Sequence, residues 1–554
     1  MSASDKKKLR KEQREAALTE KQQKALKEAK QLKRMTTAFV SILVVIAIAF
    51  CAFMIGRYII RNGVLEKRTI AATVDGTDLN TIEFTYYYSD AINDYYQNAY
   101  NTYGTNTEIM LLYYSGLDIA KPLNEQTNPE TGKSWAEYFI DVALSNAQSD
   151  YALYNKAMAD ADFDCDSDEI NSVVDTEASY LTWNAYFAGS MDAYMRAAYC
   201  NGATEEGYLE YVRKNAIAAA YYNDHKDNLS YTAEQVDTYT ADRYNEFSSF
   251  NYNYYTISYS SYLNKEEGTT NEDGTITYTE EQKNAAREAA RADAEALMNC
   301  NSVEALNLAI ASLSFNKDLT TPATSTASTD ILYSTLKEEY AEWLADAERK
   351  EFDVKAFPVE NTTTVDGKEV TTVDSYNIVM YRSTNENLKK HGNVRHVLVQ
   401  FEQSLGESGN YTVTDEAKTA AKEEADKLYA DWKEAGATKE GFIQMVKDRS
   451  DDPGKTTNEG LYEDIHPSSE YLAEFRDWAV DPARIEGDHG IVQTSEGYHI
   501  MYFEGYSDET YRDYLVNTSM INEDMTEWYE GILETATATL KDTSRLDTAM
   551  VISG

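Results

Sequence analysis

Hydrophobic and polar residues alternate in two short segments late in the chain, residues 394–399 (VRHVLV) and 496–501 (EGYHIM). Alternation with a period of two predicts β-strands whose successive side chains point to opposite faces. Each strand carries a histidine, His396 in the first and His499 in the second. Between them, apolar residues recur at helical spacing in residues 414–436 and again around residues 442–446. This pattern predicts a β-α-β module over residues 392–506.

A long apolar run lies near the N-terminus. Residues 35–56 contain 22 residues without a charge, which as a helix would span about 33 Å and exceed a bilayer core of about 30 Å. The first 36 residues hold twelve Lys/Arg against five Asp/Glu, and this excess predicts a cytoplasmic N-terminus. We therefore expect a basic cytoplasmic helix (1–36) and a single transmembrane helix (37–60) in the cell membrane. A cleaved signal peptide is the alternative, but its apolar region would be only about 7–15 residues long.

The segment that follows, residues 67–239, is expected to be mostly helical. It opens with two short strand edges around an Asp75-Gly76 turn, after which Asn80 or Thr81 caps a helix that has Glu83 in its first turn. Helical periodicity then recurs in three further segments, residues 135–144, 168–188 and 204–212. Their Tyr- and Met-rich faces are either ordinary helix-packing core or an adaptable surface for holding other chains.

An internal repeat precedes the module at 392–506. Residues 251–257 align with 393–399, and residues 375–381 align with 497–503. Tyr254 and Asn377 stand where the later copy has its two histidines. We read residues 250–385 as a degenerate copy. The predicted fold class is α+β: a transmembrane helix, a helical domain, two β-α-β modules, and a C-terminal helix in residues 507–554 that packs on the helical domain.

Charge and cysteine content narrow the classes of function. The chain carries 51 basic and 94 acidic residues, and beyond Arg57 the count is 38 against 89, a net charge of −51. Nucleic acid is therefore not an expected partner. Cys165, Cys200 and Cys300 lie beyond the membrane segment, and an odd number cannot be fully paired, so a disulfide framework is not expected. A single Cys165–Cys200 bridge stays open. The 44 tyrosines favour packed cores over disorder.

The order of these motifs resembles the parvulin family of peptidyl-prolyl isomerases. In that family the two histidine strands are central neighbours, so their imidazoles meet beneath the substrate proline. The resemblance implies a catalytic set and a set of proline-pocket walls. The catalytic set is His396, His499, Asp452 and Thr494, and the pocket walls are Leu461, Tyr471 and Phe475.

Within that resemblance, Asp452 would sit beside the substrate carbonyl and Thr494 would tie the imidazoles into a hydrogen-bonded chain. Asp452 has either a raised pKa or a steric and electrostatic role, and these alternatives stay open. The family's glycine-rich loop is only partly retained, because Asn458 and Glu459 stand in its first positions. No Lys/Arg cluster follows His396, which disfavours the phosphate-reading branch of the family.

Residues 67–239 resemble the chaperone domain of SurA and PrsA, and SurA also pairs a silent parvulin unit with an active one. The implied function is an extracytoplasmic, membrane-tethered foldase that isomerises X-Pro bonds in exported proteins and holds unfolded polypeptides. No cofactor or metal is expected, because the other histidines lack metal-ligand spacing. Two alternatives are a tethered holdase without catalysis, whose two histidines are merely buried, and a surface adhesin or peptide-binding protein.

Overall fold

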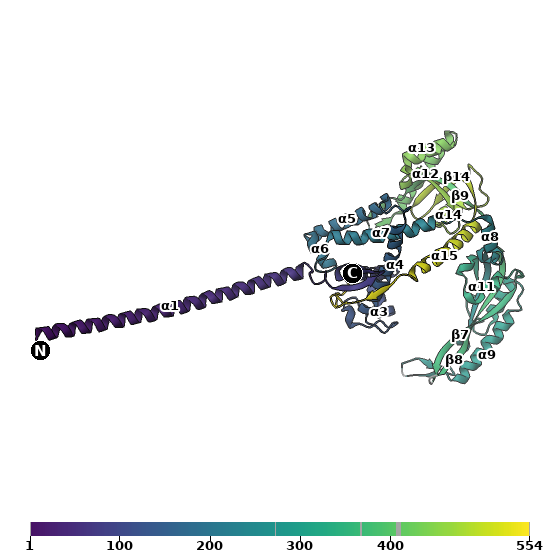
Figure 1. Ribbon diagram of the computed structural model, residues 1–554. Coiled ribbons are helices and arrows are strands. Elements are labelled where there is room, and N and C mark those ends of the chain that lie inside the picture. The colour runs from purple at the N-terminus through teal and green to yellow at the C-terminus, as the bar shows by residue number, and fades with distance from the viewer. Residues whose placement is uncertain (1, 272, 366–367, 406–410, 553–554) are drawn as a thin grey trace. The chain divides into compact units, whose positions relative to one another are not determined.

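A computed structural model describes residues 2–271, 273–365, 368–405 and 411–552. It divides into two compact units (Figure 1). The first comprises Met1–Leu229 with Asp524–Gly554, and the second comprises Ser230–Glu523. We describe each unit by itself.

The first unit is mainly helical, as the periodicity predicts. Its helices are α1 (Ala3–Arg61), α2 (Thr81–Tyr103), α3 (Thr107–Ser115), α4 (Trp135–Ala159), α5 (Asp168–Ala188), α6 (Met191–Ala198), α7 (Glu205–Asp227) and the end of α15 (Tyr511–Leu533). Its strands are β1 (Ile70–Val74), β2 (Thr77–Asn80) and β15 (Ala538–Leu540). One continuous helix, α1, contains both the basic segment and the apolar run. Its stretch Lys30–Arg61, in which the most apolar 18 residues have a mean hydropathy of 3.0, is long and apolar enough to cross a membrane.

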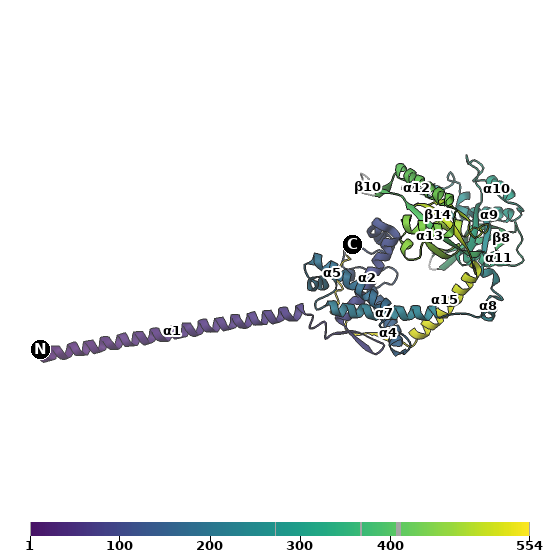
Figure 2. The same cartoon turned by 90° about the horizontal axis from the view of Figure 1, so that it is seen from above.

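The entry to the helical domain forms as its sequence predicts. Asn80 is the residue that caps α2. Its side chain accepts the amide N–H of Ile82 and that of Glu83, and the Glu83 carboxylate accepts the amide N–H of Asn80. Strand β1 pairs with β2 and, on its other side, with β15 from the end of the chain. Helices α4 and α5 both pack along α7 (Figure 2). The core between these elements is aromatic and includes the fully buried Tyr86, Tyr88, Trp135 and Phe139.

The second unit contains both modules. The first module has α8 (Ala233–Thr240), β3 (Ser249–Ser258), β4 (Thr269–Thr270), β5 (Ile276–Thr277), α9 (Glu280–Leu297), α10 (Val303–Ser312), β6 (Thr326–Leu332), α11 (Glu338–Ala345), β7 (Val354–Val365) and β8 (Lys368–Asn385). The second has β9 (Lys390–Gln400), β10 (Gln403–Leu405), β11 (Tyr411–Val413), α12 (Asp415–Glu434), α13 (Lys439–Arg449), β12 (Leu461–Ile465), α14 (Ala473–Ala479), β13 (His489–Gln493), β14 (Gly497–Thr510) and the start of α15.

The two modules share one sheet topology. The strand order is β6-β3-β8-β7 in the first and β12-β9-β14-β13 in the second, and every neighbouring pair is antiparallel. In both modules the first and last strands in sequence are the central neighbours. Two helices follow the first strand and a short helix follows the second. The internal repeat in the sequence thus corresponds to a repeated architecture.

The strand register matches the sequence alignment position by position. In the second module Met501 pairs with His396 and His499 pairs with Leu398. In the first, Val379 pairs with Tyr254 and Asn377 pairs with Thr256. Because one-residue slips would move whole rows of side chains to the other face, this agreement puts Tyr254 and Asn377 on the same face of their sheet as the two histidines of the later copy.

Each face of the second sheet has its own cover. On one face, Val397 and Ile500 pack against the buried side of α12, which presents Ala421, Ala425, Leu428 and Trp432. On the other face, Met501 and Phe475 belong to a second apolar cluster. His396 and His499 project to this second face, beside Phe475 of α14. The close approach of β9 and β14 requires Gly497, because a Cβ there would lie 2.3 Å from the Val399 carbonyl oxygen.

Candidate active site

Two adjacent central strands bring His396 and His499 into contact. The Nδ1 atoms of the two imidazoles are 3.0 Å apart, a hydrogen-bonding distance. Both side chains are almost fully buried. They lie 103 positions apart in sequence, so only the pairing of β9 with β14 brings them together.

Thr494 continues this contact on the far side of His499. Its Oγ1 lies 2.9 Å from His499 Nε2 and accepts the amide N–H of Glu496 at 3.2 Å. Thr494 begins the β13–β14 turn, where its own amide N–H donates to the Gly497 carbonyl. The turn therefore fixes the hydroxyl against the imidazole.

Asp452 approaches His396 from the opposite side. It lies in a turn after α13 that β9 holds in place: the Ser450 hydroxyl accepts the amide N–H of Leu398, and the Asp451 carboxylate accepts that of Gln400. The Asp452 carboxylate lies 3.5 Å from His396 Nε2. It also accepts the Tyr462 hydroxyl proton at 3.0 Å and the Gly454 amide N–H at 2.7 Å.

Burial and neighbouring charges leave His499 neutral and Asp452 ionised. Burial and the neighbouring His396 lower the pKa of His499 from 6.5 to about 3, so its imidazole is neutral. Burial alone would raise the pKa of Asp452, but His396, the Tyr462 hydroxyl and the Gly454 amide outweigh it and hold that pKa below its usual value. Asp452 is therefore ionised. Burial and the Asp452 charge together raise the pKa of Tyr462, which stays protonated.

These states limit the hydrogen bonds. An ionised Asp452 can only accept, and its carboxylate faces His396 Nε2 across 3.5 Å without a hydrogen bond between them. The 3.0 Å contact between the two Nδ1 atoms needs a proton on one of them, and the Thr494 hydroxyl lies against His499 Nε2. The result is a row of polar groups from Thr494 through both imidazoles to the Asp452 carboxylate.

Aromatic rings form the wall above the histidines. The Phe475 ring centroid lies 5.0 Å from that of His396 and 5.4 Å from that of His499. Tyr462 lies 5.1 Å from His396, and Tyr471 contacts both Tyr462 and Phe475 at 5.7 Å. Tyr471 is more than a third exposed, so it forms the rim while Phe475 forms the floor.

The second module is similar to a known protein family. Residues 396–505 match the family model of the rotamase, or PPIC-type PPIase, domain. These residues are a parvulin-type peptidyl-prolyl isomerase domain. No curated protein sequence matches the chain.

The solved structures that are similar to parts of the chain include two of the peptidylprolyl isomerase PrsA. The structure from Bacillus anthracis is 20% identical and covers 27% of this chain and 59% of that chain, with a TM-score of 0.17. The structure from Bacillus cereus is 20% identical and covers 29% and 57%, with a TM-score of 0.18. Both matches span less than two thirds of the PrsA chains.

The isomerase domain gathers most of the residues predicted from sequence, with one exception. Leu461 pairs with Arg395, and Tyr462 pairs with Val394. Since Arg395 and His396 point to opposite faces of β9, Leu461 projects away from the histidines. The structure does not place Leu461 in the pocket wall. Tyr462, the next residue, takes the position in the wall that was predicted for Leu461.

Tyr462 is also the residue that sequence reasoning missed. It contacts the His396 ring and bonds the Asp452 carboxylate, so it links the wall to the row of polar groups. The alternation of β12 around Gly460 could have identified it. Gly460 has φ +70°, and a Cβ there would lie 2.7 Å from the His396 carbonyl oxygen. The glycine therefore lets β12 approach β9 and present Tyr462.

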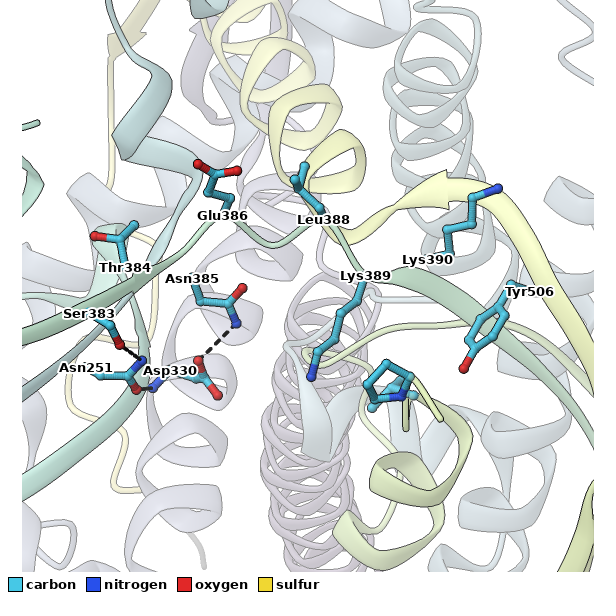
Figure 3. A pocket seen from close by; sticks show the side chains of 12 residues that line it. Asn251, Asp330, Ser383, Thr384, Asn385, Glu386, Leu388, Lys389, Lys390 and Tyr506 are labelled. Carbon is cyan, nitrogen blue, oxygen red and sulfur yellow. Dashed lines mark hydrogen bonds between the residues drawn. The ribbon is translucent and has the colours of Figure 1, made fainter. Parts of the chain in front are cut away.

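A separate hollow of about 800 Å³ is lined by residues that include Asn385, Lys389 and Tyr506 (Figure 3). Polar bonds cross one side of it: Asn251 donates to the Ser383 hydroxyl and accepts the Asp330 amide N–H, and Asn385 donates to the Asp330 carboxylate. Its lining includes neither imidazole nor Asp452. Its size alone does not mark it as the site of the isomerase domain.

Proposed function

We propose that the chain is an extracytoplasmic, membrane-tethered foldase whose isomerase domain rotates X-Pro bonds in exported polypeptides. The row of polar groups from Thr494 through both histidines to Asp452, under an aromatic wall, carries this proposal. The first unit, in the same proposal, holds unfolded clients. Exposed apolar side chains on α3 support this role, including Ile109, Tyr113 and Tyr114.

The proposed mechanism is selective binding of the twisted amide. Rotation about a peptide bond faces a barrier of about 18–20 kcal/mol, because resonance moves charge onto the carbonyl oxygen. The proline ring has no N–H donor, so the apolar wall of Phe475 and Tyr462 suits it. A carboxylate at Asp452 near the carbonyl opposes the negative charge that the planar form requires. The twisted form carries less of that charge and is bound better.

In this mechanism the histidines are positioning residues. The two imidazoles contact each other, and His396 lies against the carboxylate, so the pair holds Asp452 in place without proton transfer. Tyr462 and the Gly454 amide fix the carboxylate from two further sides. A rigid, preorganised carboxylate loses no energy to reorganisation when the amide twists.

The test is a proline-isomerisation assay on the full-length protein. Asp452→Asn keeps the size of the side chain and removes its charge, and should lower the rate roughly 10-fold or more with an unchanged melting temperature. Glu463→Gln, an exposed carboxylate on the same strand as Tyr462, is the matched control and should have no effect on the rate. If the wild type suppresses aggregation yet accelerates no X-Pro bond, the isomerase proposal fails and a tethered holdase remains.

The proposed tether has its own test. The basic residues before α1's apolar stretch favour a cytoplasmic N-terminus. Protease added to intact cells should then degrade everything after Arg57 and spare residues 1–36. Full protection of the large acidic region would contradict this topology.

A further inference from the structure

An exposed aromatic cluster lies at the C-terminal end of α5. Trp183, Tyr186 and Phe187 are 63%, 82% and 69% exposed. Phe187 contacts the other two rings at centroid distances of 4.8 and 5.4 Å. Because soluble surfaces rarely expose several large aromatics together, such a cluster marks a place where another surface docks.

This cluster adjoins the point where α1 enters the first unit. Helix α5 ends at Ala188, and α6 begins at Met191. The last residue of α1, Arg61, bonds the Asp192 carboxylate at 2.5 Å. Just beyond it, the backbones of Gly63 and Gly202 touch, since a Cβ on Gly202 would lie 2.7 Å from the Gly63 Cα. The α5–α6 corner is thus fastened to the base of α1.

This contact lies at the position along α1 where lipid headgroups are expected. The uncharged run ends at Gly56, and Arg61 lies five residues further, about 7.5 Å along a helix. The headgroup layer on each side of a bilayer is roughly 5–8 Å thick. If residues 35–56 fill the hydrocarbon core, Arg61 and the adjoining aromatic cluster lie at the headgroup layer, where Trp and Tyr are enriched in membrane proteins.

The charges at the corner also suit phospholipid. Arg57, Arg61 and Arg196 line a hollow of about 540 Å³ together with Phe53 and Gly56. Asp192 bonds two of these arginines, which leaves a local excess of positive charge. Residues 178–200 contain only Asp192 and Arg196 as charged residues, in a region beyond the membrane that is otherwise strongly acidic. Arginine matches phosphate geometry through bidentate hydrogen bonds.

We propose that the α5 aromatic cluster and Arg57, Arg61 and Arg196 form an interfacial docking surface that seats the first unit on the phospholipid headgroups of the bilayer crossed by α1. This inference rests on the proposed tether. The surface would set the first unit close to the membrane, where exported chains emerge. The exposed side chains of α3 are not part of this surface, and they stay available for polypeptide.

The test measures the depth of Trp183 in vesicles. The full-length protein is reconstituted into phosphatidylglycerol vesicles whose acyl chains carry bromine near the headgroup end, and Trp emission is compared with that in unbrominated vesicles. Subtracting the signal of Trp183→Phe, which keeps an aromatic ring, isolates Trp183 from the other tryptophans. Trp183 should lose most of its emission. Tyr113→Ser on α3, a matched exposed aromatic, should leave that loss unchanged.

Phe53→Trp serves as the reference for the tether, because Phe53 lies inside the apolar run. Quenching at both positions supports the docking surface. Quenching at position 53 without quenching of Trp183 overturns it while the tether stands, and the aromatic cluster is then a polypeptide surface. Absence of quenching at both positions overturns the tether and the docking surface together. Equal quenching of Trp183 in phosphatidylcholine and phosphatidylglycerol would overturn the part assigned to the arginines.

Discussion

The two modules of the second unit have the same sheet and different chemistry. Strand order and register agree at the positions of Tyr254 and His396, and of Asn377 and His499. In the first module the buried Asn377 is satisfied locally, by the Thr256 hydroxyl at 2.7 Å and the Glu339 carboxylate at 3.0 Å. In the isomerase domain the equivalent residue, His499, lies between Thr494 and His396 in the row of polar groups that ends at Asp452. The comparison shows that the fold needs only a satisfied polar residue at this position, whereas the proposed catalysis needs the whole row.

The largest expected effect comes from the aromatic walls. Phe475 is 4% exposed and contacts both imidazoles, so Phe475→Ala should destabilise the isomerase domain by about 3–5 kcal/mol. Trp343 lies on α11, the short helix of the first module that corresponds to α14, and is only half-buried, so Trp343→Ala should cost that module less. Hydrogen exchange resolved by module measures both. Equal costs would mean that the two pockets are packed alike and would contradict the difference between the modules.

The next effect concerns the histidines themselves. His396→Ala and His499→Ala each leave a buried partner unpaired, a cost of about 1–3 kcal/mol. If that cost raises the free energy of the bound twisted amide relative to the bound planar form, X-Pro isomerisation should slow roughly 5- to 150-fold. Asn377→Ala is the matched change in the first module and should leave the rate of the full-length protein unaltered. A similar loss of rate from both changes would show that both modules contribute to activity.

Lowering the pH should destabilise the isomerase domain more than the first module. Because the pKa of His499 falls to about 3 in the folded domain, the unfolded chain takes up a proton first as pH drops below 6.5. Stability is then fully present above pH 6.5 and is lost as pH falls toward 3. Between pH 6.5 and pH 5 the loss from His499 alone is about 2 kcal/mol.

Other histidines of the isomerase domain add to this loss. Burial lowers the pKa of His391 and His489, and burial together with His391 lowers that of His466 to about 4. Residues 250–385 contain no histidine. Chemical denaturation at pH 7 and pH 5, followed by hydrogen exchange in each module, should show the loss in residues 392–506 only. An equal loss in the first module would contradict the assignment to histidine.

The smallest effect is on the stability of the first module. Asn377→Ala removes the partner of the Thr256 hydroxyl and of the Glu339 carboxylate, and both of those residues reach solvent. Water can replace the lost bonds, so the cost should be about 1 kcal/mol. Asn377→Asp, which keeps an acceptor but loses the amide donor, should weaken the bond to Glu339 through repulsion of the two carboxylates. Denaturation midpoints measure both changes.

Much of the site could be predicted from the sequence because strand alternation is local. The VRHVLV and GYHIM segments indicated two strands with one histidine each, and the repeat indicated a second sheet of the same order. Asp452 and Thr494 followed from the family resemblance. Tyr462 was missed because the register of β12 against β9 decides whether residue 461 or residue 462 faces the histidines. That register depends on the close approach at Gly460, which joins segments more than 60 positions apart.

The sequence by itself determined the apolar run of α1, the helical first unit, the two repeated modules and the identity of the paired histidines. Only the tertiary structure decided that Asp452 is ionised, because its lowered pKa arises from the His396, Tyr462 and Gly454 groups assembled around it. It also decided that the aromatic residues of α5 lie outside the core. Periodicity describes one helix at a time, whereas exposure depends on which neighbouring elements cover that helix.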